Sequence, residues 1–518
     1  MRKLLFNKRS FCLIAILLLS GLIYFYKLDK IPSGFYVDEA SVAYNAHSII
    51  NTGKDEYGFS LPLYFRLMGS YTPSLYIYLS AFLIKFFGSS LIVFRSISAV
   101  SMIISVFFFY LLTKKLNLYK KKISVLLMTF FYSITPWIVF NARLGYETTF
   151  GFMLFTIGIY LLFSALTKPK HLVWSMLFLS ISTYVSHNQR FLTPLFIFVF
   201  IFFFRKIIFK KSNRGNLITT FVVGLVTQIP NILMLGTNAF WIKNEQFGFK
   251  YFWNFLQYLS PKTIFYESGD IDLQHTIPGL SIMYNWMVIP YFIGTYLLIK
   301  NIKNNNFKFL TIYSVVSLIP AVFSGHFLST QRMLTFAIPL VIVIGLGVDW
   351  FLGHVGKIKS LLLMTFLVSY SLIQLIGGYF ILFPKERADA WNYGYDKVAN
   401  YIKDNSENNF LFDNTRNPRA YILLLYYLDY SPSKYQKEVD PVFRENYYSA
   451  IKVIDNYHFS NVETRQIDWS VDPQKDLIII GDPLSVSAGQ AAEHSLTMID
   501  QIKNPAGNIL FNIYRTNP

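Results

Sequence analysis

The chain has 518 residues, of which 53% are hydrophobic, 18% are aromatic and only 15% are charged. In soluble domains about a quarter of all residues are charged, so this composition indicates a polytopic membrane protein. The formal net charge of +18 would suit a nucleic-acid-binding protein only if it lay on a soluble part. Most of it lies instead in short loops between apolar stretches, which excludes nucleic acid as a partner.

Eleven apolar stretches have about the 17–25 residues needed to cross the roughly 30 Å hydrocarbon core of a bilayer. They predict a polytopic α-helical membrane protein with about eleven transmembrane helices. No small-residue cleavage site follows the first stretch, which we therefore interpret as a retained helix. The stretches occupy residues 10–26, 91–112, 123–140, 148–166, 171–186, 191–209, 216–235, 280–299, 308–323, 333–352 and 359–383.

The distribution of charge between these stretches predicts the orientation of the chain. Six alternate segments together hold 21 Lys and Arg and no acidic residue: 1–10, 113–122, 166–171, 205–214, 300–308 and 353–359. Cytoplasmic loops are enriched in Lys and Arg, and anionic inner-leaflet lipid faces them. We therefore expect an integral protein of the cytoplasmic (plasma) membrane, with a cytoplasmic N-terminus and an extracytoplasmic C-terminus.

Residues 385–518 have a different pattern from the transmembrane domain 1–384. Apolar periodicity predicts helices at 388–404 and 418–428 and strands at 409–413, 477–481 and 509–515. We expect a small extracytoplasmic α/β domain with a core of its own. The single cysteine, Cys12, excludes a cysteine-built metal site there.

The exterior loop 27–90 is too long for a turn and too apolar for a free loop. Apolar residues at Val42, Ala46 and Ile49 have helical spacing, and Asp38 and Glu39 precede them as a first helical turn would require. This pattern predicts a juxtamembrane helix on the membrane surface. A second amphipathic piece, 73–87, is also expected at the interface.

Polar groups recur at the other exterior helix ends. Taken singly, acids in a first turn complement the helix dipole, and an Arg or His at a helix end usually reaches toward the membrane interface. Taken together, they predict one outward-facing cavity, in which a carboxylate can act as a base and cations can hold a phosphate. These groups are Arg143, Glu147, His187, Arg190, His275, His326 and Arg332.

An ordered series of landmarks resembles GT-C glycosyltransferases of family 39 type, a group that includes the protein O-mannosyltransferases and the lipid A aminoarabinose transferases. The resemblance extends over nearly the whole chain, with most weight on the acidic pair. The landmarks are Val37-Asp38-Glu39-Ala40, Asn51-Thr52-Gly53-Lys54-Asp55, Leu61-Pro62-Leu63, Tyr71-Thr72-Pro73, Phe94-Arg95-Ser96, Arg190-Phe191-Leu192-Thr193-Pro194, Gln331-Arg332-Met333 and Trp391-Asn392-Tyr393-Gly394-Tyr395.

The resemblance implies an inverting membrane enzyme that moves a sugar from a polyprenyl-phosphate carrier to a protein, lipid or glycan acceptor on the outer face. Asp38 matches the essential loop acid of the family, and Glu147 matches an acid just past the third transmembrane helix. Where some members have an acid and a Lys before the proline, this chain has Tyr71 and Thr72. Metal dependence therefore stays open.

We assign Asp38 as the base, with Glu39 and Glu147 as its supports or as part of a cation site. The donor phosphate is assigned to Arg190, His275, Arg332 and Arg66, and a divalent metal, if one is used, to Asp38, Glu39 and His275. Two other functions remain open: a transporter or flippase of a lipid-linked glycan, and a non-catalytic envelope assembly factor. A transporter would place its ionisable groups near helix midpoints, whereas here they lie at helix ends.

Overall fold

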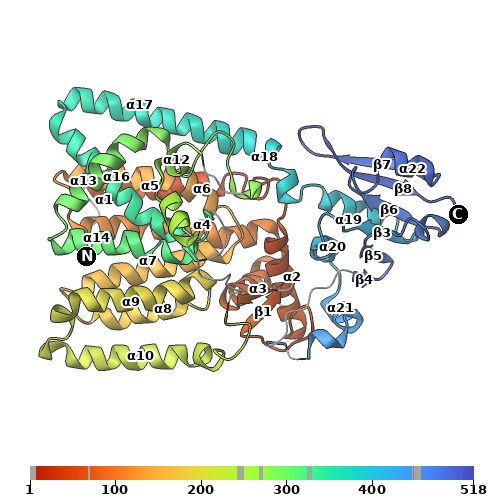
Figure 1. Cartoon of the computed structure of the whole chain (residues 1–518), viewed down its shortest axis with the longest axis horizontal. Coiled ribbons are helices and arrows are strands. Elements are labelled where there is room, and N and C mark those ends of the chain that lie inside the picture. The colour runs from red at the N-terminus through yellow and green to blue at the C-terminus, as the bar shows by residue number, and fades with distance from the viewer. Residues whose placement is uncertain are drawn as a thin grey trace. The chain divides into compact units, whose positions relative to one another are not determined.

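A computed structural model gives the structure of the chain (Figure 1), and it describes residues 8–67, 70–241, 250–267, 272–323, 329–445, 447–448 and 457–518. The chain forms two compact units. The first, here the helical unit, comprises Met1–Leu28, Arg95–Leu235 and Trp241–Leu382. The second, here the mixed unit, comprises Asp29–Phe94, Gly236–Phe240 and Phe383–Pro518. Each unit is thus assembled from separate pieces of the sequence.

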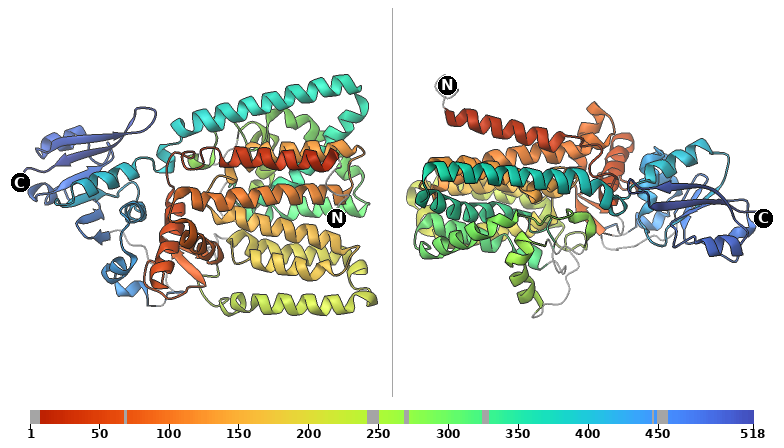
Figure 2. Two further views of the ribbon diagram at one scale, coloured as in Figure 1. Left: turned by 180° about the vertical axis from the view of Figure 1, so that it is seen from behind. Right: turned by 90° about the horizontal axis from the view of Figure 1, so that it is seen from above.

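The helical unit is a bundle whose long helices run side by side, with α10 and α17 on opposite flanks (Figures 1 and 2). Its helices are α1 (Lys8–Phe25), α4 (Leu91–Leu116), α5 (Lys122–Ile134), α6 (Pro136–Asn141), α7 (Glu147–Ala165), α8 (His171–Ser182), α9 (His187–Ile208), α10 (Arg214–Leu233), α11 (Lys250–Tyr258), α12 (Pro261–Phe265), α13 (Val288–Lys300), α14 (Asn305–Val316), α15 (Ile319–Val322), α16 (Ala337–His354) and α17 (Lys357–Leu375), which is followed by a π-helical segment (Ile376–Leu382).

Each of the eleven predicted apolar stretches overlaps a helix of this bundle, which confirms a polytopic helical membrane protein. Seven helical spans in the described part of the chain are long and apolar enough to cross a membrane, judged by length and composition. Helices α5, α8, α13 and α14 have only 12–13 residues. The number eleven therefore stays a prediction.

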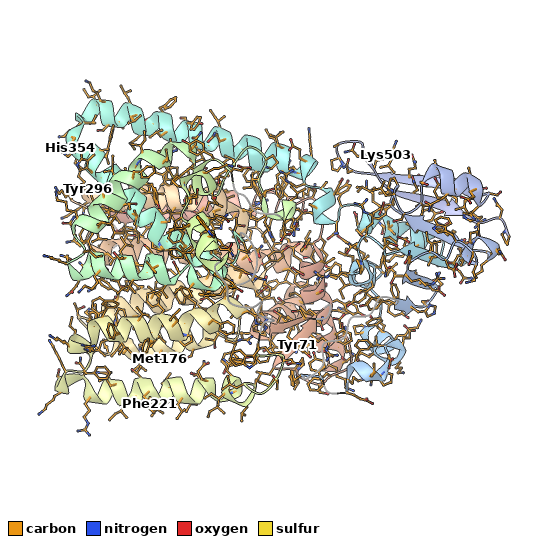
Figure 3. All side chains as sticks on the ribbon, viewed as in Figure 1. Tyr71, Met176, Phe221, Tyr296, His354 and Lys503 are labelled. Atoms are coloured by element: carbon orange, nitrogen blue, oxygen red, sulfur yellow. The ribbon has the colours of Figure 1, made fainter. Side chains whose placement is uncertain are left out.

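Small residues allow close packing inside the bundle. A Cβ at Gly294 of α13 would lie 1.8 Å from the carbonyl oxygen of Val343 in α16, so the two backbones touch directly. Met176 of α8 packs over Gly224 of α10, while Phe221 of α10 points away from the bundle and is 70% exposed (Figure 3). Such an outer surface suits contact with lipid.

One acid in a predicted span, Asp349 of α16, serves as a helix cap. Its carboxylate accepts the backbone N–H groups of Lys120 and Lys121 at 2.8 and 2.9 Å and the hydroxyl of Ser124 at 2.6 Å. Lys121 is the N-cap residue of α5 and Ser124 lies in its first turn, where the first N–H groups of a helix have no partner within it. Asp349 therefore fastens α5 to α16.

The mixed unit joins the first exterior loop to the C-terminal residues. The loop contributes α2 (Val37–Thr52), β1 (Tyr64–Leu67), β2 (Ser70–Pro73) and α3 (Leu75–Phe87). The C-terminal part contributes α18 (Phe383–Glu386), α19 (Tyr395–Asp404), β3 (Phe410–Asp413), α20 (Ala420–Tyr427), α21 (Pro432–Glu438), β4 (Tyr457–Phe459), β5 (Val462–Arg465), β6 (Ile478–Gly481), α22 (Ala488–Glu493), β7 (Thr497–Lys503) and β8 (Ile509–Arg515).

A six-stranded sheet forms the C-terminal part, with the order β4-β5-β3-β6-β8-β7. Strand β3 is parallel to β5 and β6, and the outer pairs are antiparallel. The expected α/β fold of the C-terminal residues is therefore confirmed, although β4, β5 and β7 were not predicted. The helix expected at 388–404 begins only at Tyr395, because Asn392 and Gly394 adopt left-handed backbone angles.

Helix α2 forms where the loop pattern predicted a helix, but its surroundings differ from the prediction. Ten of its sixteen residues are buried, and it packs on α3, α20 and α21 of the same unit. The amide of Gln436 in α21 donates to the hydroxyls of Ser48 and Thr52 at 2.9 and 3.0 Å. Other parts of the mixed unit thus cover much of α2, and its location at the membrane surface stays a prediction.

Candidate active site

The two acids at the start of α2 have different environments. Glu39 is fully buried, and its Oε2 accepts the backbone N–H of Tyr36 at 3.4 Å, as the third residue of a helix does in a capping box. Asp38, the preceding residue, is exposed. The sequence predicted that both acids serve one reaction, with Asp38 as the base and Glu39 as its support. In the structure the Glu39 carboxylate accepts a hydrogen bond at the start of α2. Asp38 is therefore the more accessible of the two candidate bases.

Residues near the end of the chain hold the segment that leads into α2. A Cβ at Gly34 would lie 1.8 Å from the carbonyl oxygen of Trp391, so only glycine permits this approach. The rings of Phe35 and Tyr426 pack with their centroids 4.7 Å apart. The position of Asp38 within the mixed unit thus depends on contacts with C-terminal residues.

Arg66, assigned from the sequence to the donor phosphate, is buried within the mixed unit. Its guanidinium donates to the carbonyl oxygens of Phe443 and Tyr447 at 3.0 and 2.7 Å and to the hydroxyl of Tyr71 at 3.0 Å. It also lies 5.1 Å from the centre of the Tyr447 ring. These contacts join β1 to the segment around Tyr447, so the structure gives Arg66 a packing role that the sequence did not predict.

Two further loop acids, Asp55 and Glu56, form a buried pair for which the sequence predicted no role. Asp55 accepts hydrogen bonds from the Tyr447 hydroxyl and from the backbone of the loop, and Glu56 accepts one from the Tyr421 hydroxyl at 3.3 Å. Burial raises the pKa of Asp55 to about 6. Burial, with the neighbouring Asp55 carboxylate, raises the pKa of Glu56 to about 8. Glu56 is therefore mainly protonated at neutral pH.

In the helical unit, the start of α7 lies beside the loop that carries His275. Glu147 begins α7 and is half-buried. The ring of Tyr146, the residue before it, packs edge-on against the imidazole of His275, with centroids 6.4 Å apart. The imidazole Nδ1 lies 3.9 Å from a carboxylate oxygen of Asp272. The structure thus brings two predicted site positions, Glu147 and His275, into one region of this unit.

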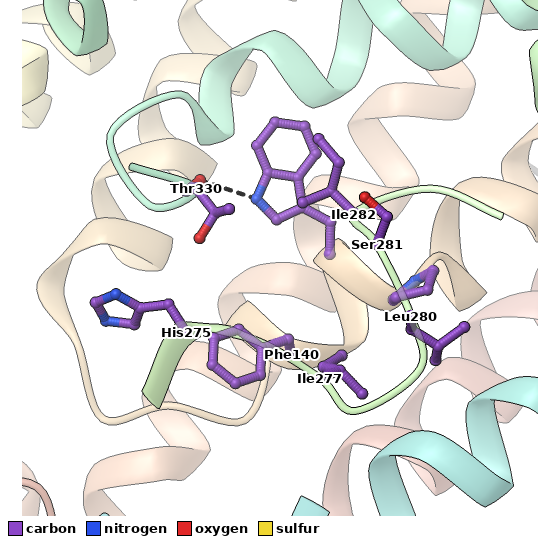
Figure 4. A pocket seen from close by; sticks show the side chains of 9 residues that line it. Phe140, His275, Ile277, Leu280, Ser281, Ile282 and Thr330 are labelled. Atoms are coloured by element: carbon purple, nitrogen blue, oxygen red, sulfur yellow. Dashed lines mark hydrogen bonds between the residues drawn. The ribbon is translucent and has the colours of Figure 1, made fainter. Parts of the chain in front are cut away.

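A cleft opens next to His275 (Figure 4). Its walls are mostly apolar, and the indole N–H of Trp137 donates to the carbonyl oxygen of Thr330 at 2.9 Å, which fixes one wall. In this conformation the cleft has room for about one water molecule. The lining residues are Pro136, Trp137, Phe140, His275, Ile277, Leu280, Ser281, Ile282 and Thr330.

Two predicted phosphate-binding arginines also belong to the helical unit. Arg190 lies in the first turn of α9 and is only 4% exposed, and its guanidinium is 2.9 Å from Nδ1 of His187. Arg332 is half-buried in the turn before α16, where its backbone N–H donates to the hydroxyl of Ser329 at 3.4 Å. His326, expected near Arg332, lies outside the described residues.

Arg143, also expected at the cavity, makes its described hydrogen bonds to the end of α1. Its guanidinium donates to the carbonyl oxygens of Ile23, Tyr24, Tyr26 and Lys27 at 2.7–3.2 Å. The last carbonyl groups of a helix have no partner within it, and a cation there complements the dipole. These bonds assign Arg143 to helix capping.

The sequence assigned a divalent metal to Asp38 and Glu39, which lie in the mixed unit, and to His275, which lies in the helical unit. No group of three His, Cys, Asp or Glu side chains suited to a metal ion occurs in the described part of the chain. Glu39 is engaged at the helix start, as described above. A metal at Asp38, Glu39 and His275 therefore stays a prediction.

Comparison with solved structures identifies the fold. The chain is similar to ArnT from Cupriavidus metallidurans in the apo state and bound to undecaprenyl phosphate, each with a TM-score of 0.58, 9% identity and 99% coverage of both chains. It is also similar to the oligosaccharyltransferase AglB from Archaeoglobus fulgidus in complex with an inhibitory peptide and a dolichol-phosphate. That match has a TM-score of 0.51 and 11% identity, and covers 98% of this chain and 74% of that one. No protein-family model and no curated protein matches the sequence.

The chain therefore has the fold of the GT-C membrane glycosyltransferases, as the resemblance in the sequence predicted. The likeness extends over both units, including the C-terminal sheet. At 9–11% identity the likeness concerns the fold alone.

Proposed function

We propose that this protein is a membrane glycosyltransferase that moves a sugar from a polyprenyl-phosphate carrier to a protein, lipid or glycan acceptor on the outer face of the membrane. The observation that carries the proposal is the match over the full length of both chains to ArnT, whose structure was also solved with undecaprenyl phosphate bound. The charge pattern adds support, because acids and cations gather at helix starts that the sequence places outside.

In the proposed reaction, an acceptor hydroxyl attacks the anomeric carbon of the sugar, and the bond from that carbon to the phosphate oxygen breaks. Asp38 takes the hydroxyl proton, since its carboxylate is exposed while that of Glu39 is buried. In-line attack inverts the anomeric configuration. The electron pair of the broken bond stays on the polyprenyl phosphate, which is a stabilised leaving group and needs no protonation.

The groups proposed to hold that phosphate are Arg190, His275 and Arg332. A buried guanidinium is an effective partner for phosphate because it is always charged and donates in two directions. Glu147 is proposed to orient the imidazole of His275, since the ring of Tyr146 at the start of α7 packs against that imidazole. Arg66 has no part in this proposal, because its hydrogen bonds serve the mixed unit.

The test uses the full chain in lipid nanodiscs with a radiolabelled sugar on undecaprenyl phosphate and an extract of envelope lipids, glycans and proteins. We expect label to move to acceptor material, and Asp38→Asn to lower the rate at least about 10²-fold, as removal of a general base does. Glu445→Gln, a change at an exposed acid, is the matched control.

Three results would contradict the proposal. Transfer from a nucleotide sugar without lipid carrier would assign a different donor. Movement of the intact lipid-linked sugar from one leaflet of a vesicle membrane to the other, without sugar transfer, would indicate a flippase. Equal rates for Asp38→Asn and the parent would return Asp38 to the ordinary role of an acid that complements a helix dipole.

A further inference from the structure

Helix α17 does not end as an α-helix. The residues that follow it, Ile376–Leu382, form a π-helical segment, a rare conformation that is frequent at functional sites. Ser371, Leu375 and Tyr379 are buried at intervals of four residues. In a regular α-helix, residues four apart drift by about 40° around the axis. The wider π-helical turn rotates less per residue, so it keeps both Gly378 and Tyr379 on the buried side.

Gly378 touches the loop that forms one wall of the cleft at His275. A Cβ at this position would lie 2.9 Å from the carbonyl oxygen of Pro278 and 2.9 Å from Cδ1 of Leu280. Contacts this short require a shift, and the Pro278 oxygen belongs to the backbone. A Cβ at the preceding residue, Gly377, would meet no atom within 4 Å. Adjacent glycines thus differ sharply in what they touch.

The loop is also fixed on its other side. The carbonyl oxygen of Ile282 accepts the backbone N–H of Trp137 at 3.2 Å, and the hydroxyl of Ser281 donates to the carbonyl of Thr263 at 2.7 Å. Leu280, Ser281 and Ile282 all line the cleft. A side chain at position 378 would therefore displace the wall of the cleft, because hydrogen bonds hold the far side of the loop.

A second contact joins the π-helical segment to another lining residue of the cleft. The ring of Tyr379 packs edge-on against that of Phe140, a lining residue on α6, with centroids 6.1 Å apart. The guanidinium of Arg143 lies 5.5 and 5.1 Å from the ring centres of Tyr379 and Phe380. The bonds of Arg143 to the end of α1 thus anchor the π-helical segment.

We infer that the π-helical segment is a positioning element that sets the width of the cleft at His275, and that Gly378 is the positioning residue through which it acts on the loop. The inference rests on the proposed function, in which His275, a lining residue of the cleft, helps to hold the phosphate of the lipid carrier. A side chain at 378 displaces Leu280, a lining residue, and narrows the cleft. The carrier then binds less tightly, while the proton transfer at Asp38 is unaffected.

The test compares Gly378→Ala with its neighbour Gly377→Ala in the full chain. We measure the Kd for undecaprenyl phosphate in detergent, and KM and kcat for transfer from the sugar-loaded carrier. For Gly378→Ala we expect Kd and KM to rise about tenfold with kcat within about twofold, which is a loss of about 1.4 kcal/mol in carrier binding. For Gly377→Ala we expect the values of the parent.

A double-mutant cycle with Leu280→Ala separates this effect from general destabilisation. Because Leu280 supplies one of the two short contacts, its truncation should restore part of the binding in the Gly378→Ala protein, so that the two changes are not additive. If the parent binds the carrier and both glycine variants bind it equally well, or if the cycle is additive, the positioning role is refuted and the proposed function stands. If the parent neither binds nor uses the carrier, the proposed function fails, and the inference fails with it.

Discussion

The buried carboxyl of Glu56 should make the stability of the mixed unit depend on pH. Its pKa is raised from 4.5 to about 8, first by burial and then by the carboxylate of Asp55. The folded protein therefore binds a proton at Glu56 between about pH 4.5 and 8 that the unfolded chain releases. The stability that protonated Glu56 contributes is fully present below the pKa that Glu56 has in the unfolded chain. It is lost as the pH rises toward the pKa that Glu56 has in the folded protein.

The size of the effect follows from one proton. Where only the folded state binds it, the free energy of unfolding falls by about 1.4 kcal/mol per pH unit. Asp55 contributes in the same direction, but only below its folded pKa of about 6. Between pH 6.5 and 7.5 the slope therefore reports mainly on Glu56, and we expect a loss of about 1 kcal/mol over this interval.

The assay is urea unfolding of the full chain in detergent at pH 6.5, 7.0 and 7.5, followed by tryptophan fluorescence. Glu56→Gln, which is neutral at every pH, should remove most of the slope and raise the stability at pH 7.5. The control is Glu493→Gln, which changes the charge equally at an exposed position of α22. A parent without a pH slope, or equal slopes in Glu56→Gln and the parent, would refute the argument that Glu56 folds in its protonated form.

Three other predictions concern different parts of the chain. Arg66→Ala should lower the free energy of unfolding of the mixed unit by about 3 kcal/mol in the same urea assay, because two carbonyl groups lose a charged donor. Unchanged stability together with weaker binding of the carrier would instead support a role of Arg66 at the phosphate. Asp349→Ala should lower the free energy of unfolding by about 1–2 kcal/mol, the usual value of a lost helix cap, and this loss should appear as a lower thermal midpoint in detergent. The midpoint of Asp349→Asn should lie closer to that of the parent. Equal midpoints for the parent and both variants would contradict the capping role. In a Cys12→Ser background, a cysteine at exposed Ser470 should react with an impermeant thiol reagent in intact cells and one at exposed Ser212 should not, and the reverse result would invert the orientation.

The features that the sequence predicted well are those that depend on local pattern. Apolar stretches identified the helices of the bundle, and the acids Asp38 and Glu39 marked the start of α2. The surroundings of α2 could not be predicted, because its sequence gives no sign that α20 and α21, which lie more than 350 residues later, pack on it. Contacts between such distant parts of the chain leave no periodic signal.

The partners of single cations could not be predicted either, for a related reason. Arg143 was expected at the outward-facing cavity, and Arg66 was assigned to the donor phosphate. In the contacts described above both donate to backbone carbonyl groups, which every residue carries, so no residue type in the sequence identifies these partners. The roles of Glu147, Arg190, His275 and Arg332 remain predictions.

The division of the mixed unit into separate pieces of sequence limits the topologies that the membrane part can have. A compact unit lies on one side of a bilayer, so residues 29–94, 236–240 and 383–518 must all emerge on the same side. The chain must then cross the membrane an even number of times between residues 94 and 236, and again an even number of times between 240 and 383. The eleven predicted helices satisfy this rule with six and four crossings, and the seven long spans satisfy it with four and two. Any revised assignment of short helices such as α5 and α8 must therefore add or remove crossings in pairs within each interval.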